Sequence, residues 1–440
     1  MRSMRRLPLR GTALVAGLAL ALTACGGGED GDSDGATGTS LKGVKLEVAA
    51  VWTGGEAENF KKVLAGFTKK TGATVTYTPT GDNVAAYLGS KIQGGGPPDV
   101  AMLPQQGVLV EFAKKGWIKP LGDDVKQLMQ QNYAQIWQDL GSSDGKLYGV
   151  YFKAANKSLM WYRPRAFEDA GITQPPTTWA DLVKTAGTLS DSGATPLSVA
   201  GGDGWTLTDW FENVYASSAG GEKYNQLAKH EIKWTDPTVK DALRRLAELW
   251  KPNYLAGGAD GSLQADMPKS VTAVFGPDPK AAMVYEGDFV AGVITGETEA
   301  KVGTDAKVFP FPAVGAKPPV VGGGDAAVVL KENKGAQELV KYLASAEAAT
   351  IWAKLGGFTS PNKAVNPASY PDDIQRQIAK SVIDAGNDFR FDMSDLAPAA
   401  FGGTKGSGEW KRLQDFLKNP GDVDAAAAAL EADAAKAFKN

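Results

Sequence analysis

Three rounds of strand-like and then helix-like sequence near the start of the chain constrain the fold more than any other feature. Short alternating or apolar runs at residues 44–48, 74–78 and 100–103 are typical of β-strands. Each run is followed by apolar residues at helical spacing and then by glycine, which commonly ends helices. This alternation predicts an α/β fold in which a mostly parallel sheet is covered by helices on both faces.

Polar residues and one tryptophan follow these three strands. Trp52 follows the first strand, Asp82 and Asn83 follow the second, and Gln105 and Gln106 follow the third. Ligands bind at the carboxyl ends of parallel strands, where these residues would meet. A flat ring suits the apolar face of a sugar, and carboxylates or amides suit its hydroxyl groups. We therefore predict that the five contact a ligand, although Asp82 is also a typical turn residue.

Later segments continue the α/β pattern. Residues 147–150, 158–162, 281–285 and 326–330 are strand-like. Thr178 and Asp181 have the spacing of a capping box, with Asp in place of the usual Glu. The spacing predicts that a helix begins at this point.

The first 25 residues have the order of an export signal. Four arginines precede an apolar run at residues 12–22 that is too short to span a bilayer, and the segment closes with Leu22-Thr23-Ala24-Cys25. This ending resembles the lipobox of bacterial lipoproteins, in which the cysteine is acylated and becomes the first residue. We predict a signal peptide at residues 1–24, lipidation of Cys25 and a flexible linker at residues 25–40. An ordinary secretory signal that happens to contain a cysteine is the alternative.

Composition excludes several classes of function. The net charge is −3 with both signs mixed along the chain, which argues against a nucleic-acid partner. The sequence has one cysteine, Cys25, and one histidine, His230, so disulfides, zinc sites and Cys/His catalysis have almost no residues to use. We predict no metal and no cofactor.

Several segments spread along most of the chain resemble the extracellular solute-binding protein family 1, the sugar-type receptors of ABC importers. They occur in family order, at residues 96–100, 116–121, 147–162, 175–181, 281–287, 309–310 and 343–357. Within this family, Tyr285-Glu286-Gly287-Asp288-Phe289 is similar to the receptors for α-glucosides.

The resemblance implies a two-lobed periplasmic-binding-protein-like fold of type II, with a cleft at a hinge that the chain crosses several times. Lobe one would comprise residues 41–155 and 322–365. Lobe two would comprise residues 156–321 and 366–440. Glycines at two of the expected crossings, in residues 322–324 and 356–357, suit a hinge because glycine tolerates large changes in backbone angles.

The resemblance also implies ligand contacts from lobe two. Trp205 and Trp210 lie where the family has a stacking aromatic residue, and Asp209 lies between them. Glu286 and Asp288 follow a strand that usually delivers another aromatic residue. The three acids have simpler alternatives: Asp209 suits the first turn of a helix, and the other two suit a solvated loop.

Residues at the expected crossings complete the predicted site. These are Asn156, Asp325 and Phe358. The chain departs from the family at Phe289, where a tryptophan is frequent, and this departure weakens the case for a long oligosaccharide.

The leading hypothesis is a monomeric, extracytoplasmic lipoprotein that is anchored to the outer face of the cell membrane through Cys25. It would bind a carbohydrate, an oligosaccharide or α-glucoside, between its lobes and deliver it to the permease of an ABC importer, without enzymatic activity. A receptor for a polyamine is one alternative, because the candidate acids and aromatic rings suit a cation. Anionic solutes are disfavoured, since few basic residues follow the strands. A membrane-anchored glycoside hydrolase that uses Glu286 and Asp288 is the other alternative.

Overall fold

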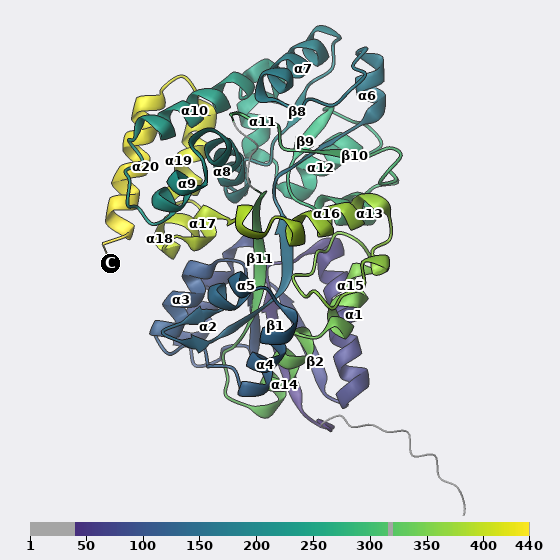
Figure 1. Ribbon diagram of the computed structural model, residues 1–440, viewed down its shortest axis with the longest axis vertical. Helices are drawn as coiled ribbons and strands as arrows, with labels where there is room; N and C mark the ends of the chain where they lie inside the picture. The colour runs from purple at the N-terminus through teal and green to yellow at the C-terminus, as the bar shows by residue number, and fades with distance from the viewer. Residues whose placement is uncertain (1–39, 316–319, 440) are drawn as a thin grey trace, which may run out of the picture. The chain divides into compact units, whose positions relative to one another are not determined.

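The computed structural model describes residues 40–315 and 320–439 (Figure 1). The predicted signal peptide, Cys25 and nearly all of the predicted linker lie outside the described residues. No helix within the described ranges is long and apolar enough to cross a membrane. Ser40–Asn440 forms one compact unit that holds all three sheets and all the buried clusters described below, so it can be produced alone.

The first lobe contains the three strands predicted at the start of the chain. β1 (Lys45–Ala50) lies between β2 (Thr74–Pro79) and β3 (Val100–Leu103), and both pairings are parallel. The connecting helices are α1 (Gly54–Thr71) and α2 (Val84–Gln93), and α3 (Gln106–Lys114) follows β3. α1 ends at Gly72, whose positive φ of 79° lets its N–H bond back to the Thr68 carbonyl.

Two long buried strands complete this sheet and run towards the second lobe. β11 (Val320–Val329) pairs antiparallel with β3 and with β6 (Gly149–Asn156), and it pairs parallel with β12 (Phe389–Phe391). In the described residues the sheet has six strands, in the order β12-β11-β3-β1-β2 with β6 beside β11. A Cβ on Gly324 would lie 2.7 Å from the Lys153 carbonyl oxygen, so glycine permits the close approach of β11 to β6.

The second lobe is built on a smaller sheet. Its order is β10 (Lys307–Pro310), β7 (Leu159–Tyr162), β9 (Met283–Tyr285) and β8 (Leu197–Ser198). β8 and β9 are parallel, but β7 runs antiparallel to both of its neighbours. The prediction of a mostly parallel sheet therefore holds for the first lobe and not for the second. The reason is that β7 continues outward from β6 while β10 leads back towards β11, so the two strands run in opposite directions.

Helices cover both sheets (Figure 1). Around the first sheet the remaining elements are α4 (Asp123–Asn132), α5 (Gln135–Leu140), β4 (Ser142–Ser143), β5 (Lys146–Leu147), α14 (Lys334–Leu343), α15 (Ala346–Ala353) and α16 (Asp373–Asp384). The second lobe adds α6 (Pro164–Asp169), α7 (Trp179–Asp191), α8 (Trp205–Ala219), α9 (Gly221–Ala228), α10 (Pro237–Leu249), α11 (Gly258–Gln264), α12 (Met267–Phe275), α13 (Val290–Glu297), α17 (Met393–Leu396), α18 (Ala399–Gly402), α19 (Gly408–Lys418) and α20 (Val423–Ala437). Short 3-10 turns are η1 (Gly81–Asn83), η2 (Pro252–Tyr254), η3 (Pro367–Ser369) and η4 (Gly386–Asp388).

The helix predicted to begin at Thr178 is confirmed as α7, with Thr178 as its N-cap, but the reciprocal bond of a capping box is replaced by one from the Thr178 hydroxyl. The Thr178 hydroxyl oxygen accepts the N–H of Asp181 at 3.2 Å, and the hydroxyl donates to the Asp181 carboxylate at 2.7 Å.

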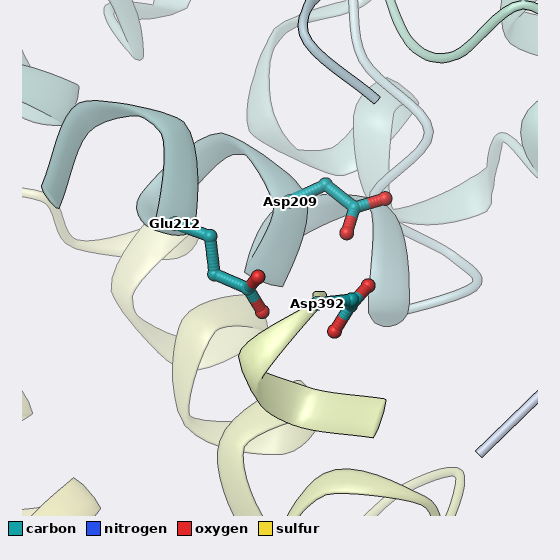
Figure 2. A group of neighbouring side chains, drawn as sticks. All are labelled: Asp209, Glu212 and Asp392. Carbon is teal, nitrogen blue, oxygen red and sulfur yellow. The ribbon is translucent and has the colours of Figure 1, made fainter. Parts of the chain in front are cut away.

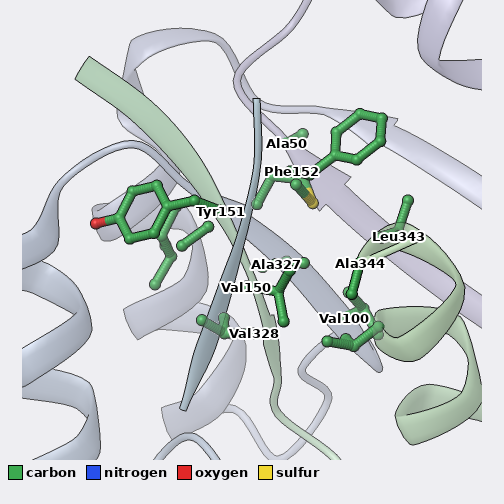
Figure 3. Packing of buried hydrophobic residues seen from close by; sticks show 14 of the residues in the cluster. Ala50, Val100, Val150, Tyr151, Phe152, Ala327, Val328, Leu343 and Ala344 are labelled. Carbon is green, nitrogen blue, oxygen red and sulfur yellow. The ribbon is translucent and has the colours of Figure 1, made fainter. Parts of the chain in front are cut away.

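Separate apolar clusters lie under the two sheets. The first cluster surrounds β3, β6 and β11, and Figure 3 shows Val100, Val150 and Val328 among its members. It also includes Tyr370, Ala379, Val382, Phe389 and Phe391, from a segment that the sequence assigns to lobe two. The second cluster joins the small sheet to the helices beside it, with Trp210, Phe211 and Trp250 among its largest side chains. A third cluster contains Trp161, Val271 and Ile294.

Candidate functional site

A cavity of about 320 Å³ lies between residues of the two lobes. The first lobe contributes the residues after β1 and β2, the end of β3, and parts of β6 and β11. The second lobe contributes the starts of α8, α12 and α19 and the segment from Phe289 into α13. Its charged, amide and aromatic lining residues are Trp52, Glu56, Asp82, Gln105, Lys153, Lys157, Asp203, Trp205, Asp266, Phe289, Glu297, Asp325, Asp395 and Trp410.

Five of the predicted site residues line this cavity. They are Trp52, Asp82, Gln105, Trp205 and Asp325. Trp205 is half-buried at the start of α8, and its ring meets the Phe289 ring edge-on at 6.0 Å. The Oε1 atom of Gln105 is buried and has no hydrogen-bond partner among the described residues, so it can accept a bond from a ligand.

Trp52 lies at the first-lobe end of the cavity, but it is 3% exposed. Its ring meets Phe60 and Trp352 edge-on, with centroids 4.8 and 4.9 Å away. Most of the ring therefore belongs to the core of the first lobe, and only a small part reaches the cavity.

Other predicted residues are absent from the described cavity wall. Asn83 is exposed in η1, and Gln106 begins α3 and is half-buried. Asn156 uses its side chain within the protein, donating to the Ser381 hydroxyl and accepting the Ser158 N–H, both at 2.8 Å.

Two of the predicted aromatic residues pack in the cores. Trp210 is 1% exposed and packs against Tyr285 at 4.5 Å. Phe358 stacks on Trp352 at 5.2 Å.

Three predicted acids are buried behind the wall. Asp209 pairs with Lys157, and Asp288 accepts a hydrogen bond from the Thr359 hydroxyl. Glu286 accepts only the N–H of Gly287, at 3.1 Å, and its Oε1 has no partner in the described residues. Burial raises the pKa of Glu286 to about 8 and the pKa of Asp288 to about 6.

Lys153 of β6 brings a positive charge to the first-lobe side of the cavity. Its Nζ lies 2.5 Å from Glu56 Oε1 and 5.2–5.6 Å from the ring centroids of Trp52, Phe289 and Trp352. Burial alone lowers the pKa of Lys153, but the carboxylates of Glu56 and Asp325 offset this and hold it above its ordinary value. The lysine is therefore an ammonium ion, and a charged donor strengthens hydrogen bonds to hydroxyl oxygens.

Lys157 follows β6 and has a different environment. Its Nζ lies 3.1 Å from Asp209 Oδ1 and 3.9 Å from Asp395 Oδ2, and it also donates to Asp392. Burial lowers the pKa of Lys157, but these three carboxylates raise it well above its ordinary value. The ammonium also lies 5.2 Å from the centre of the Trp205 ring. Lys157 thus ties α8 to the chain around α17.

Asp209, Glu212 and Asp392 form a buried carboxylate cluster beside Lys157, and Figure 2 shows them converging from α8 and the start of α17. Their nearest oxygens lie within 4.8 Å of one another. However, Glu212 accepts the N–H groups of Met393 and Ser394 and the Tyr224 hydroxyl. Asp392 accepts the N–H of Asp395. With an ammonium alongside, the cluster caps α17 and does not suit a divalent cation.

Sequence reasoning missed several lining residues, notably Glu56, Lys153, Lys157, Asp203, Asp395 and Trp410. A signal existed for the two lysines, because a lysine in an apolar strand needs a partner. No comparable signal marks Asp395 or Trp410, which come from the last part of the chain. The argument against anionic solutes also needs correction, since it rested on a scarcity of basic residues and two lysines line the cavity.

The chain is similar to known solute-binding proteins along most of its length. The sequence profile of the family described as bacterial extracellular solute-binding protein matches residues 53–350. The osmoprotective compounds-binding protein GgtB of Synechocystis is 32% identical over 416 residues, which cover 92% of this chain and 94% of that protein. The α-glucosides-binding periplasmic protein AglE of Rhizobium meliloti is 32% identical over 412 residues, which cover 90% and 88%.

Solved structures agree at the level of the fold. The bacterial solute receptor AcbH, described as having an exclusive preference for β-D-galactopyranose, superposes with a TM-score of 0.77 at 21% identity. The match covers 90% of this chain and 99% of that one, so the predicted two-lobed fold is confirmed. The profile match and the two full-length relatives confirm the resemblance found in the sequence. The protein belongs to the bacterial extracellular solute-binding family, whose members are extracytoplasmic receptors and not enzymes.

Proposed function

We propose that this protein is the receptor of an ABC importer and that it encloses a small carbohydrate in the cavity between its lobes. The observation that carries the proposal is the cavity lining itself. Half-buried Trp205 offers a ring, Gln105 offers an unpaired acceptor, and Lys153 and Asp325 offer charged hydrogen-bonding groups. Such a combination suits a solute with apolar C–H faces and many hydroxyl groups.

The size of the cavity favours a short sugar. Ligand pockets span roughly 300–1,000 Å³, and this cavity of about 320 Å³ lies at the low end. A mono- or disaccharide fits this volume better than a long oligosaccharide does. The names of the two full-length relatives, which refer to α-glucosides and to osmoprotective compounds, support a small glucoside.

A polyamine is the second candidate, because carboxylates outnumber lysines among the described residues that line the cavity. The position of Lys153 argues against it. Its ammonium already lies within 5.6 Å of three aromatic ring centres, where a cationic ligand would gain most.

The proposal includes the membrane anchor and the partner. We propose that Cys25 carries the lipid, that the protein acts as a monomer on the outer face of the membrane, and that the closed form docks on a permease. We also propose that the predicted lobe ranges hold, except that residues 366–391 belong with lobe one. The pairing of β12 with β11 and the buried contacts of Tyr370 and Phe391 support this change.

A ligand panel tests the proposal directly. The melting temperature of residues 40–440 would be recorded with glucose, galactose, maltose, sucrose, trehalose, maltotriose, raffinose and spermidine. A ligand that binds only the folded protein stabilises it by about 2.7 kcal/mol at one hundred times its Kd. We expect the largest rise with a disaccharide. A higher melting temperature with spermidine alone would show a polyamine receptor in place of a sugar receptor. An unchanged melting temperature with every compound would contradict a carbohydrate receptor.

A further inference from the structure

One ion-pair cluster links the two lobes away from the strands that cross between them. Asp82 lies in η1, after β2 of the first lobe. Asp203 precedes α8 in the second lobe, and Lys405 follows α18. The Nζ atom of Lys405 lies 3.5 Å from Asp82 Oδ2 and 3.7 Å from Asp203 Oδ1. We call these three residues the clasp.

The two acids of the clasp are held differently. Asp203 is fixed, because its side chain is 9% exposed and its Oδ2 accepts the Met267 N–H at 2.6 Å. The side chains of Asp82 and Lys405 are 26% and 40% exposed, so they can separate into water. Burial and the facing carboxylate of Asp82 raise the pKa of Asp203 to about 7. The two acids therefore oppose one another when the lobes meet, unless a cation lies between them.

The backbone near the clasp is in close contact across the same seam. A Cβ on Gly107 of α3 would lie 2.0 Å from the Ala397 carbonyl oxygen, and a Cβ on Gly403 would lie 3.3 Å from Gln105 Cγ. Figure 1 shows α17 and α18 next to α3 along this side of the molecule. These contacts join segments of different lobes, so they exist only while the lobes are together.

We propose that Lys405 is a positioning residue that stabilises the closed arrangement of the lobes by neutralising Asp82 and Asp203 where they meet. Opening the cleft moves Asp82 away from Asp203 and hydrates all three groups. Without the ammonium, the closed form must either hold two facing carboxylates or protonate Asp203, and above about pH 7 both alternatives penalise closure only. The inference rests on the proposed receptor function, in which closure encloses the solute.

The test is a distance measurement between the lobes. Residues 40–440 contain no cysteine, so spin labels can be attached at Gln131→Cys on exposed α4 and Asn225→Cys on exposed α9. Pulsed electron–electron double resonance then gives the distribution of distances between the two labels, and from it the closed and open populations without ligand. An exposed ion pair contributes up to about 1 kcal/mol, so we expect Lys405→Met to lower the closed-to-open ratio about five-fold.

Two further variants separate the clasp from general loss of stability. Lys405→Arg keeps the charge, and it should restore the closed population. Lys411→Met removes a lysine whose ion pair with Asp415 stays inside α19, and it should leave the distances unchanged. The inference is overturned if Lys405→Met has the same closed population as the unmodified protein, or if Lys405→Arg behaves like Lys405→Met. Because no ligand is used, the result stands whether or not the sugar panel responds, and silence in that panel would contradict the receptor function alone.

Discussion

Lys153 and Lys157 are four residues apart and line the same cavity, but their ion-pair partners and their roles differ. Lys153 pairs with Glu56, whose side chain is 16% exposed, and it also lies near three aromatic rings and the carboxylate of Asp325. Lys157 contacts the carboxylates of Asp209, Asp392 and Asp395, all of them buried. If Lys153 is removed, water can hydrate the Glu56 carboxylate. If Lys157 is removed, nothing in the described structure can neutralise the buried carboxylates around it. A charged side chain in a binding cavity can therefore serve either to bind the ligand or to hold the fold together.

The largest effect is expected from removing Lys157. Lys157→Met leaves buried carboxylates without a cation, and a broken buried ion pair costs about 3–5 kcal/mol. We expect the free energy of unfolding of residues 40–440 to fall by about 4 kcal/mol in urea titrations at pH 7. A loss below about 1 kcal/mol would mean that the acids are protonated and that Lys157 is not structural.

The acids near the lysines should give the next largest effect, through pH. Burial raises the pKa of Glu286 to about 8, so its folded form holds a proton that the unfolded chain releases above about pH 4.5. Stability is therefore lost as the pH rises from about 4.5 to 8, and Glu286→Gln should remove this loss, which reaches about 3 kcal/mol at pH 7. Urea titrations from pH 4 to 9 would measure it.

Asp325, beside Lys153, is the matched residue for this experiment. Burial raises its pKa to about 6, so Asp325→Asn should flatten the dependence of the unfolding free energy on pH only below that pH. Identical profiles for the Glu286 and Asp325 variants would contradict the distinction between the two sides of the cavity.

Lys153→Met should show the reverse balance to Lys157→Met. Glu56 can be hydrated, so the unfolding free energy should fall by only about 1–2 kcal/mol. Sugar affinity, measured by isothermal titration calorimetry, should fall more than ten-fold, because a charged hydrogen bond to a ligand contributes about 1.5–3 kcal/mol. A variant that keeps its affinity but loses stability would place Lys153 with the scaffold.

The local pattern of the sequence predicted the elements well and the site only partly. Trp52, Asp82 and Gln105 were found because the ends of parallel strands meet at one edge whatever else the chain does. The lysines were missed because their partners are remote: Glu56 is 97 residues from Lys153, and Asp392 is 235 residues from Lys157. A strand pattern carries no information about such pairings.

Residue type alone also misled the placement of one tryptophan. Trp205 and Trp210 are five residues apart on α8, and at 3.6 residues per turn they point about 140° apart. Both were predicted as ligand contacts, but only one of them can face the cavity from this helix. The structure puts Trp205 at the cavity and Trp210 in the second cluster. Helix geometry, applied to the sequence, contains this distinction.

The smallest effect on stability is expected at Trp205, because its side chain faces the ligand cavity and contributes little to the fold. Its half-buried ring lies beside the Lys157 ammonium but belongs to no ion pair. Trp205→Ala should therefore lower the unfolding free energy by about 1 kcal/mol, while the loss of stacking weakens sugar binding about ten-fold. Calorimetric titration with the best sugar of the panel measures the second effect, and Trp205→Phe, which keeps a ring, should recover most of it. If alanine changed stability more than affinity, Trp205 would join Lys157 as scaffold, and Lys153 with the unpaired Gln105 acceptor would remain as the main ligand contacts.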